Sequence, residues 1–200
     1  MSVKEKIMQV ALQEFMKKGF EKPSMKSIAE KSNVSKGAIY HHFDSKDDLF
    51  FHCMKNFRNE IGTWLAEIMK NTTNFKEFIF NYFSLLSEVE KKMKELAQND
   101  KVDPKGYFIL MMNAIIKFPQ LKDQMSEMYS QLKDTIIHYM TKAQKENIIK
   151  QDLDKNITAS ELTAIFEGTL ILNIFTEEGD LEEKSKDLAV NYWNKIIRET

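Results

Sequence analysis

The residues best placed for chemistry lie close together near the N-terminus. Lys36, Gly37, Tyr40 and His41 are spaced to share the outer face of a short helix that begins after Ser35. A helix entering a DNA major groove presents its N-terminal residues to the base edges. A residue without Cβ, such as Gly37, lets the backbone come close to a partner. The group therefore points to nucleic-acid contact.

Two short helices joined by a tight turn would position this face. Ser24 is a suitable N-cap for a helix through Lys31, and Ser35 for one ending near His42. Asn33 stands at the turn, where a positive φ is needed and asparagine is tolerated. The residues expected to pack this pair against the preceding helix are Ile28, Ala29, Val34, Ile39, Ala11 and Phe15. A plain three-helix corner with solvated lysines fits the same pattern.

Other reactive residue types form no recognisable site. Cys53 is the one cysteine, so it cannot form an internal disulfide, and no Cys/His spacing suits zinc. His52 and His138 have no partner at ligand spacing, and we expect His42 to be structural. No spacing supplies a nucleophile or an acid–base pair. We expect a non-enzyme without cofactor or metal, in the reducing cytoplasm.

Charge separates the chain into two parts. Residues 1–46 contain nine lysines against five acidic residues, whereas residues 47–200 contain 20 basic against 25 acidic residues. A small basic segment followed by an acidic body is typical of a DNA-binding module carried on another domain. We expect no signal peptide and no membrane partner, because the most apolar stretch, 107–116, is far shorter than the roughly 20 residues of a membrane span.

Helical spacing of apolar residues recurs along the whole chain, and six glycines and three prolines leave few turns for a β-fold. We therefore predict an all-α fold of nine helices. Gly19 is expected to end the first helix, and Asn74 to precede the fifth. A capping box from Thr158 to Glu161 suggests the start of the eighth helix, which Gly179 would close. The last helix is expected over 181–199, and the fifth should end near Gln98.

Residues 7–49 resemble the TetR family of bacterial transcriptional regulators. The matching residues are Ala11 and Phe15, Gly19-Phe20, Ser24, Ile28-Ala29, Val34-Ser35-Lys36-Gly37, Ile39-Tyr40, His42-Phe43, Ser45-Lys46 and Leu49. Asn33 stands where the family usually has glycine, and Ser24 where it usually has threonine. The resemblance implies a helix-turn-helix DNA-binding domain over residues 1–46 and a helical ligand-binding and dimerisation domain over 47–200.

The resemblance also implies roles for individual residues. Ser24, Lys26 and Lys46 would hold phosphates, and Ser35 and Tyr40 would offer hydroxyl groups to the same backbone. Lys36 and His41 are the candidates for base edges, with Gly37 in close contact. Tyr40 could instead be a partly buried aromatic cap. Phosphate contacts position such a protein, and base contacts specify its site.

The body is rich in large, soft side chains. Most of these side chains should be core, but apolar pockets use the same residues. A TetR-like fold implies a ligand pocket between the central helices. The residues expected to line it are Tyr82, Phe83, Phe108, Met112, Asn113, Met125 and Tyr129. A solid core without a cavity is the competing expectation.

Residues 162–175 are apolar nearly all round, so a helix there must be covered on both sides. We expect its own chain to cover one side and a second copy of the chain the other. The predicted interface residues are Phe166, Leu170, Leu188, Tyr192 and Ile196. The alternative is a monomer whose own helices cover everything.

These observations predict a ligand-responsive regulator that binds a palindromic double-stranded DNA operator as a homodimer. We expect a repressor that a small apolar or amphipathic inducer releases, although activation fits the same residues. A DNA-binding structural or cell-division factor without an inducer is the alternative. Loss of operator binding on adding a ligand would separate the two hypotheses.

Overall fold

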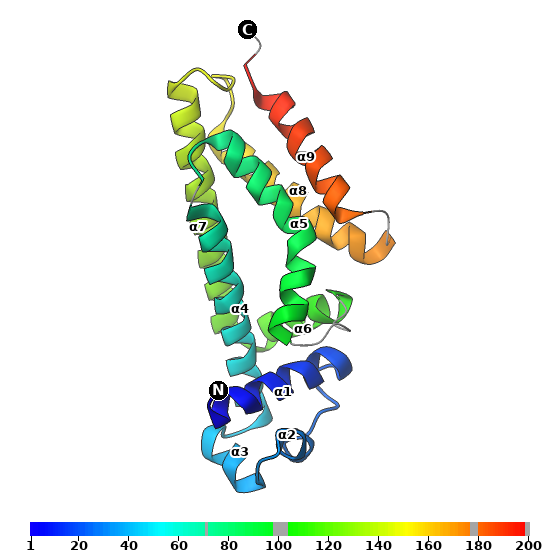
Figure 1. The fold of residues 1–200 in the computed structure, drawn as a ribbon. Coiled ribbons are helices and arrows are strands. Elements are labelled where there is room, and N and C mark those ends of the chain that lie inside the picture. Colours follow the sequence, from blue (N-terminus) through cyan, green and yellow to red (C-terminus); the bar gives the residue numbers. More distant parts are fainter. Residues whose placement is uncertain (71, 98–103, 177–179, 199–200) are drawn as a thin grey trace. The chain divides into compact units, whose positions relative to one another are not determined.

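The computed structural model describes every residue except 71, 98–103, 177–179 and 199–200. The described residues form nine helices and no strand (Figure 1). They are α1 (Val3–Lys18), α2 (Met25–Lys31), α3 (Lys36–His42), α4 (Lys46–Lys70), α5 (Phe75–Ala97), α6 (Pro104–Lys117), α7 (Pro119–Lys145), α8 (Lys155–Thr176) and α9 (Leu181–Ile196). The predicted all-α architecture is confirmed.

The chain divides into two compact units, and the first consists of Met1–Thr63 and Lys91–Gln124. In this unit α2 packs against α3, and both pack against α1. Their common core consists of side chains at most 3% exposed: Ile7, Ala11, Phe15, Ile28, Ala29, Ile39, Phe43 and Leu49. Val34, expected in the same core, is half-buried. The boundary expected between residues 46 and 47 stays a prediction.

Cys53 connects α4 to α1 in this unit. Its side chain is 2% exposed, and its Sγ donates a hydrogen bond to the Met8 carbonyl oxygen at 3.4 Å. Burial strongly raises the pKa of the thiol, because the thiolate would lose its hydration. The residue therefore acts as a small apolar side chain with a weak donor.

The second unit consists of Trp64–Glu90 and Met125–Thr200. Aromatic residues of α5 form the centre of its core, where Phe78 lies between Phe75 and Tyr82, with ring centroids 6.3 and 5.9 Å apart. The Tyr82 ring stacks on Phe166 of α8 at 4.6 Å. Such contacts add to the stability that burial of the rings provides.

Helix ends follow local sequence at most positions. Gly19 ends α1 with a φ of 75°, and Asn74 accepts a hydrogen bond from the Glu77 amide at 3.0 Å as the expected cap of α5. The expected start of α8 at Thr158 is wrong: Thr158 is buried inside the helix. The Asp154 carboxylate caps α8 instead, accepting from the amides of Asn156 and Ile157 at 2.8 and 3.0 Å.

Two other expected helix ends lie at or beyond the limits of the described residues. Gln98 and Gly179 fall on residues outside the described part of the chain. The last helix ends at Ile196, three residues before its expected end, because Ile197 pairs with Ile149 in an isolated antiparallel bridge. The amide of Arg198 also donates to the Ile148 carbonyl oxygen at 3.1 Å.

Candidate nucleic-acid interface

The α3 helix presents the polar face predicted from the sequence. Ser35 caps it, accepting a hydrogen bond from the Ala38 amide at 3.1 Å. Ile39 is fully buried and fixes the orientation of the helix on the core. The exposed residues of α3 and its cap are Ser35, Lys36, Gly37, Tyr40 and His41. The structure therefore brings all five predicted residues to one exposed surface.

The turn between α2 and α3 sets the angle of this surface. Asn33 has a φ of 53°, as expected, so the chain reverses there without a glycine. The amides of Asn33 and Val34 donate to the carbonyl oxygens of Glu30 and Ala29 at 3.1 and 3.0 Å. These hydrogen bonds satisfy the backbone of the turn and hold it in one conformation.

No contact in the described part of the chain requires a glycine at position 37. A Cβ atom built at this position would have only the Ser35 Oγ within 4 Å, at 3.8 Å, and the φ of Gly37 is not positive. The space above it is open, and the backbone there is exposed. Gly37 therefore leaves the first turn of α3 accessible to an outside partner.

Tyr40 is 45% exposed, so part of its side chain is accessible, and its role as a partly buried aromatic cap stays an alternative. The Lys36 ammonium lies 5.8 Å from the centre of its ring. The phenol hydroxyl and the cation thus occupy the same face of α3. This arrangement offers a donor and a positive charge together, which suits phosphate or base-edge contacts.

The predicted phosphate-binding residues differ in how free they are. Ser24 caps α2, where its oxygen accepts from the Ser27 amide at 3.1 Å, so its hydroxyl proton stays available. Lys26 is exposed, and its ammonium lies 4.0 Å from the Glu30 carboxylate. Such an exposed ion pair contributes little stability. Lys46 is already engaged: its ammonium donates to the Glu21 carbonyl at 3.0 Å and lies 4.4 Å from the Phe20 ring centre.

A buried carboxylate that sequence reasoning missed stabilises the same helices. Glu14 on α1 is 7% exposed and pairs with Lys18, at 2.7 Å, and with Lys31 at the end of α2. Burial by itself raises the pKa of Glu14, but the two ammonium groups outweigh it and the pKa is lowered. The signal was available: Glu14 falls on the apolar face of α1, four residues before a lysine.

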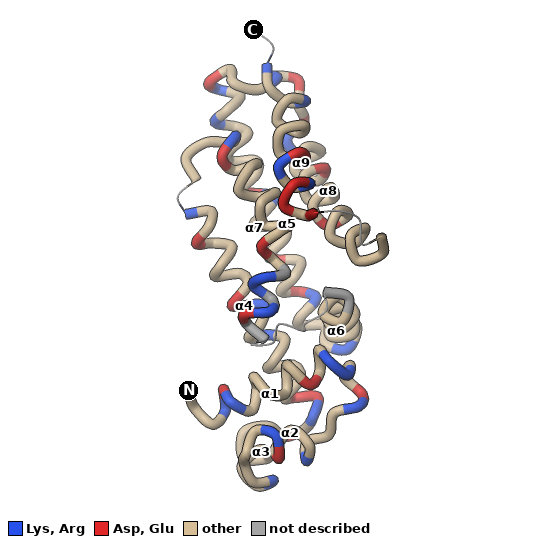
Figure 2. The backbone as a smooth tube through the Cα atoms, turned by 45° about the vertical axis from the view of Figure 1, so that its right-hand side comes forward, with Lys and Arg blue, Asp and Glu red and all other residues tan. Residues whose placement is uncertain are grey.

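Figure 2 shows basic segments on α1 to α3 with acidic segments among them, and over residues 1–46 nine lysines outnumber five acidic residues. In the same unit, α6 contacts α1, the helix against which α2 and α3 pack. The Lys117 ammonium pairs with the Asp47 carboxylate of α4 at 2.7 Å. A Cβ at Gly106 would lie 3.0 Å from the Met16 carbonyl oxygen, so a side chain there would require α6 and α1 to move apart by a few tenths of an ångström.

Known proteins share both the sequence and the arrangement of these helices. Residues 7–53, which span most of α1, all of α2 and α3, and the start of α4, match the family described as bacterial regulatory proteins, tetR family. Residues 7–53 thus belong to the TetR family of bacterial regulatory proteins. The resemblance predicted from residues 7–49 is confirmed.

The regions aligned with relatives cover different shares of this chain. The transcriptional regulator QacR of Staphylococcus aureus is 30% identical over 120 residues, which are 59% of this chain and about half, 54%, of QacR. The biofilm operon negative regulator IcaR of the same species is 24% identical over 155 residues, or 74% of this chain and 78% of IcaR. The structure of a regulator from Saccharomonospora viridis with choline has a TM-score of 0.76 at 16% identity and covers 98% of each chain, which shows a common fold.

The residues predicted to bind a ligand are divided between the two units of the regulator. Tyr82 and Phe83 are buried in the core of the second unit, which also contains half-buried Met125 and Tyr129. In the first unit, Phe108 is half-buried, whereas Met112 and Asn113 are exposed on α6. Ligand binding by these residues stays a prediction.

Glu167 is a half-buried acid of α8 near two of those residues. The Tyr129 hydroxyl donates to its carboxylate at 2.7 Å. Burial raises the pKa of Glu167, and the hydrogen bond from Tyr129 offsets only part of that effect. Burial, and then the charge of Glu167, raise the pKa of Tyr82 as well. An acid and two tyrosine hydroxyls thus lie within an otherwise aromatic region of the second unit.

The predicted dimer residues lie deeper than expected. Phe166, Tyr192 and Ile196 are at most 7% exposed in the single chain, so they have little surface left for a partner. Leu170 and Leu188 are half-buried against the same core. The exposed apolar residues of α8 and α9 are instead Ile157, Leu172, Phe175 and Val190. Periodicity missed them because a helix that is apolar all round does not reveal its inner side.

Proposed function

We propose that this TetR-family regulator is a repressor that binds a palindromic operator through α3 of two subunits and is released by a small apolar or amphipathic effector. The observation that carries the proposal is the exposed face of α3. It combines Lys36, Tyr40 and His41 with a glycine that no contact within the chain requires. The relative IcaR is named as a negative regulator of transcription, and this supports repression as the direction of regulation.

The α8 helix supports a homodimer. It is long and apolar enough to cross a membrane by length and composition alone, yet only 28% of its most apolar 18 residues are buried. Ile157, Ala164, Gly168 and Phe175 share one helical face, with Leu172 beside it. A second copy of the chain would cover this face. A two-fold dimer would place two α3 helices about 34–36 Å apart on a palindrome.

The second unit supports effector binding near Glu167. Tyr129 donates a hydrogen bond to the Glu167 carboxylate, and Tyr82, whose ring stacks on Phe166, lies close enough for the charge of Glu167 to raise its pKa. One polar anchor next to aromatic rings is the composition that small-molecule sites favour. The structural relative from S. viridis was solved with choline, so a protein of this fold accommodates a small organic ligand. Release would need an effector that binds one dimer conformation more tightly, with a coupling of about 1–3 kcal/mol.

Operator selection from genomic fragments, followed by fluorescence anisotropy, tests the proposal. We expect dimeric binding with a log–log salt slope of roughly −5 to −7, as three or four phosphates per subunit predict. Lys26→Ala should weaken all sequences alike and flatten the slope, whereas Lys36→Ala should also reduce sequence preference. Lys122→Ala on exposed α7 is the matched control.

The outcomes separate the alternatives. Salt-insensitive binding, or equal affinity of the Lys26 and Lys36 variants and the control, would refute the DNA-binding surface. Specific binding that no apolar or amphipathic compound weakens would indicate a DNA-binding factor without an inducer. The protein would act in the cytosol, where its DNA partner is.

A further inference from the structure

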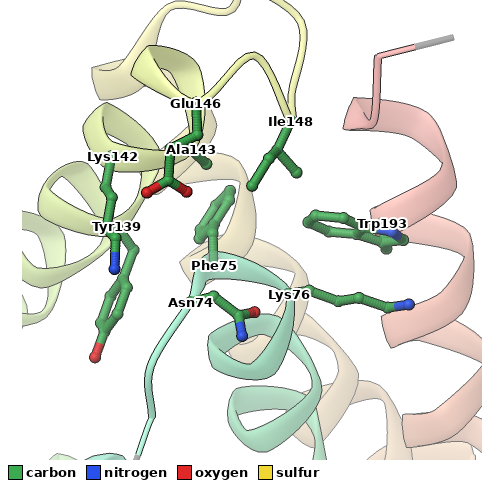
Figure 3. Close-up of a pocket in the computed structure, with 9 residues that line it drawn as sticks. All are labelled: Asn74, Phe75, Lys76, Tyr139, Lys142, Ala143, Glu146, Ile148 and Trp193. Carbon is green, nitrogen blue, oxygen red and sulfur yellow. The ribbon is translucent and has the colours of Figure 1, made fainter. Parts of the chain in front are cut away.

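The second unit has a pocket of about 210 Å³ between the start of α5, the end of α7 and α9 (Figure 3). The charged groups around it do not converge on one point. The Lys142 ammonium donates to the Thr73 carbonyl at 3.3 Å. The Lys76 ammonium lies 5.8 Å from the Trp193 ring centre, and Glu146, which also lines the pocket, is exposed. The pocket therefore selects no ligand by its charge.

Two neighbouring histidines at the end of α3, His41 and His42 (the histidine pair), have ring centres 5.1 Å apart. His41 is exposed and His42 is half-buried. In the described part of the chain, neither imidazole forms a hydrogen bond or an ion pair. A half-buried polar side chain usually has a hydrogen-bond partner. The nitrogen atoms of the pair are therefore free to contact a group outside the chain.

The other charged groups of α3 and of the helices packed against it bring no acid to the pair. On α3 itself, the Lys36 ammonium lies 5.8 Å from the Tyr40 ring centre. From α1, the Lys4 ammonium lies 5.5 Å from the ring centre of Phe43, the residue after the pair. The charged side chains of α2 form ion pairs with each other or with α1, namely Lys26 with Glu30 and Lys31 with Glu14.

The acids nearest in sequence belong to α4 and the turn before it. The Asp48 carboxylate accepts a hydrogen bond from the Asp44 amide at 3.1 Å and lies 3.5 Å from the His52 ring nitrogen. The Asp44 side chain is exposed and forms no ion pair with any described residue. His52 thus has an acid beside it, whereas the histidine pair has none within ion-pair distance among the described residues.

We propose that the histidine pair contacts a DNA phosphate in its protonated form, so that operator binding takes up protons. The proposal rests on the proposed function, because it needs α3 to face DNA. In homeodomains, the end of the recognition helix contacts the phosphate backbone. Histidine ordinarily changes its charge between pH 5 and 8, and a nearby phosphate favours the charged form. Because like charges 5.1 Å apart repel, we expect at most one proton per subunit.

The direction and size of the effect follow from this contact. The protonated form binds DNA more tightly, so operator affinity rises as the pH falls. By reciprocity, DNA favours protonation by the same factor. A hydrogen bond to a charged group changes affinity by about tenfold, so the two subunits of a dimer would together change it by up to about 100-fold.

Fluorescence anisotropy with the selected operator, between pH 6 and pH 8 at constant salt, measures this dependence. We expect wild-type affinity to be greater at pH 6 than at pH 8 by about tenfold or more. In a double variant, His41→Gln with His42→Gln, the affinity should not change over this range. A merely structural pair would instead lower the affinity equally at every pH. His138→Gln, which changes an exposed histidine of α7, is the matched control and should behave as wild type.

Calorimetry on the wild-type protein counts the protons directly and does not depend on the folding of a variant. Titrations in two buffers with different heats of ionisation should show uptake of about one proton per dimer near pH 6.5. Specific binding without proton uptake, a flat wild-type profile, or an equal loss in the double variant at both pH values would overturn the proposal and leave DNA binding intact. Absence of specific binding at every pH would refute the proposed function and this proposal together.

Discussion

Replacing Gly37 with alanine separates what α3 needs for folding from what it needs for binding. The added methyl group would have 3.8 Å to its nearest neighbour, the Ser35 Oγ, so it fits within the chain. Alanine is favoured over glycine inside a helix by about 0.8–1 kcal/mol. The variant should therefore be more stable by up to about 1 kcal/mol, a rise in Tm of roughly 2–4 °C for a chain of this size.

The same methyl group should impair operator binding. In the proposed complex it would occupy the space through which the backbone of α3 would approach the bases. Loss of one base contact costs about 1–3 kcal/mol, and a dimer with two α3 helices would lose it twice, so we expect affinity to fall by about two to four orders of magnitude. Anisotropy with the selected operator measures this loss, and differential scanning calorimetry measures Tm.

Gly62→Ala is the matched control, because Gly62 lies within α4 and a Cβ there meets nothing within 4 Å. It should raise Tm similarly and leave operator affinity unchanged. If Gly37→Ala binds the operator as well as the control does, the close approach of α3 to DNA is refuted. A Gly37→Ala variant with a lowered Tm would instead show that a methyl group does not fit above the first turn of α3.

The remaining predictions concern the dimer, the buried Glu14 and the half-buried Glu167. Leu172→Glu should fold normally, because Leu172 is 57% exposed, but should weaken dimerisation at least 100-fold in sedimentation, since burying an unpaired charge is costly; wild-type protein that is monomeric at micromolar concentration would contradict this. Glu14→Gln should lower the free energy of unfolding at pH 7 by about 1–2 kcal/mol, a value reduced for the exposure of its lysine partners. Because the pKa of Glu14 is lowered from 4.5, its contribution is present above that pH and is lost as the pH falls, so urea titrations at pH 7 and pH 3 should differ. The raised pKa of Glu167 has the opposite sign: Glu167→Gln should stabilise the protein increasingly as the pH rises above 4.5 toward the raised pKa of Glu167, and by a constant amount above it, and a Tm difference that does not change with pH would argue against a desolvated carboxylate.

Local chemistry made the DNA-binding helices predictable from the sequence. Ser24 and Ser35 cap their helices, Gly19 ends the first one, and Asn33 adopts a positive φ, each through contacts within four residues. Thr158 shows the limit of such signals. Its sequence fits a capping box, but Asp154 reaches the first free amides earlier along the chain and begins the helix there.

Features that depend on distant packing could not be predicted. Tyr192 and Ile196 are apolar at helical spacing whether they face their own chain or a partner, and only the arrangement of α5, α8 and α9 buries them. The Glu167–Tyr129 hydrogen bond joins residues 38 positions apart, and the Lys117–Asp47 pair joins residues 70 apart. No local pattern specifies such partners, because they depend on how the helices cross.

The reaction rate of the buried Cys53 thiol reports how often the protein opens locally around it. Thiol reagents react with the thiolate, so a cysteine held by Met8 and shielded by α1 reacts only when α1 and α4 separate transiently. Its rate of labelling therefore measures the free energy of that fluctuation in the native protein without any mutation. Operator binding that rigidifies α1 would slow the reaction. The same protection makes Cys53 unsuited to sensing oxidants, so peroxide should not act on this regulator through its single thiol.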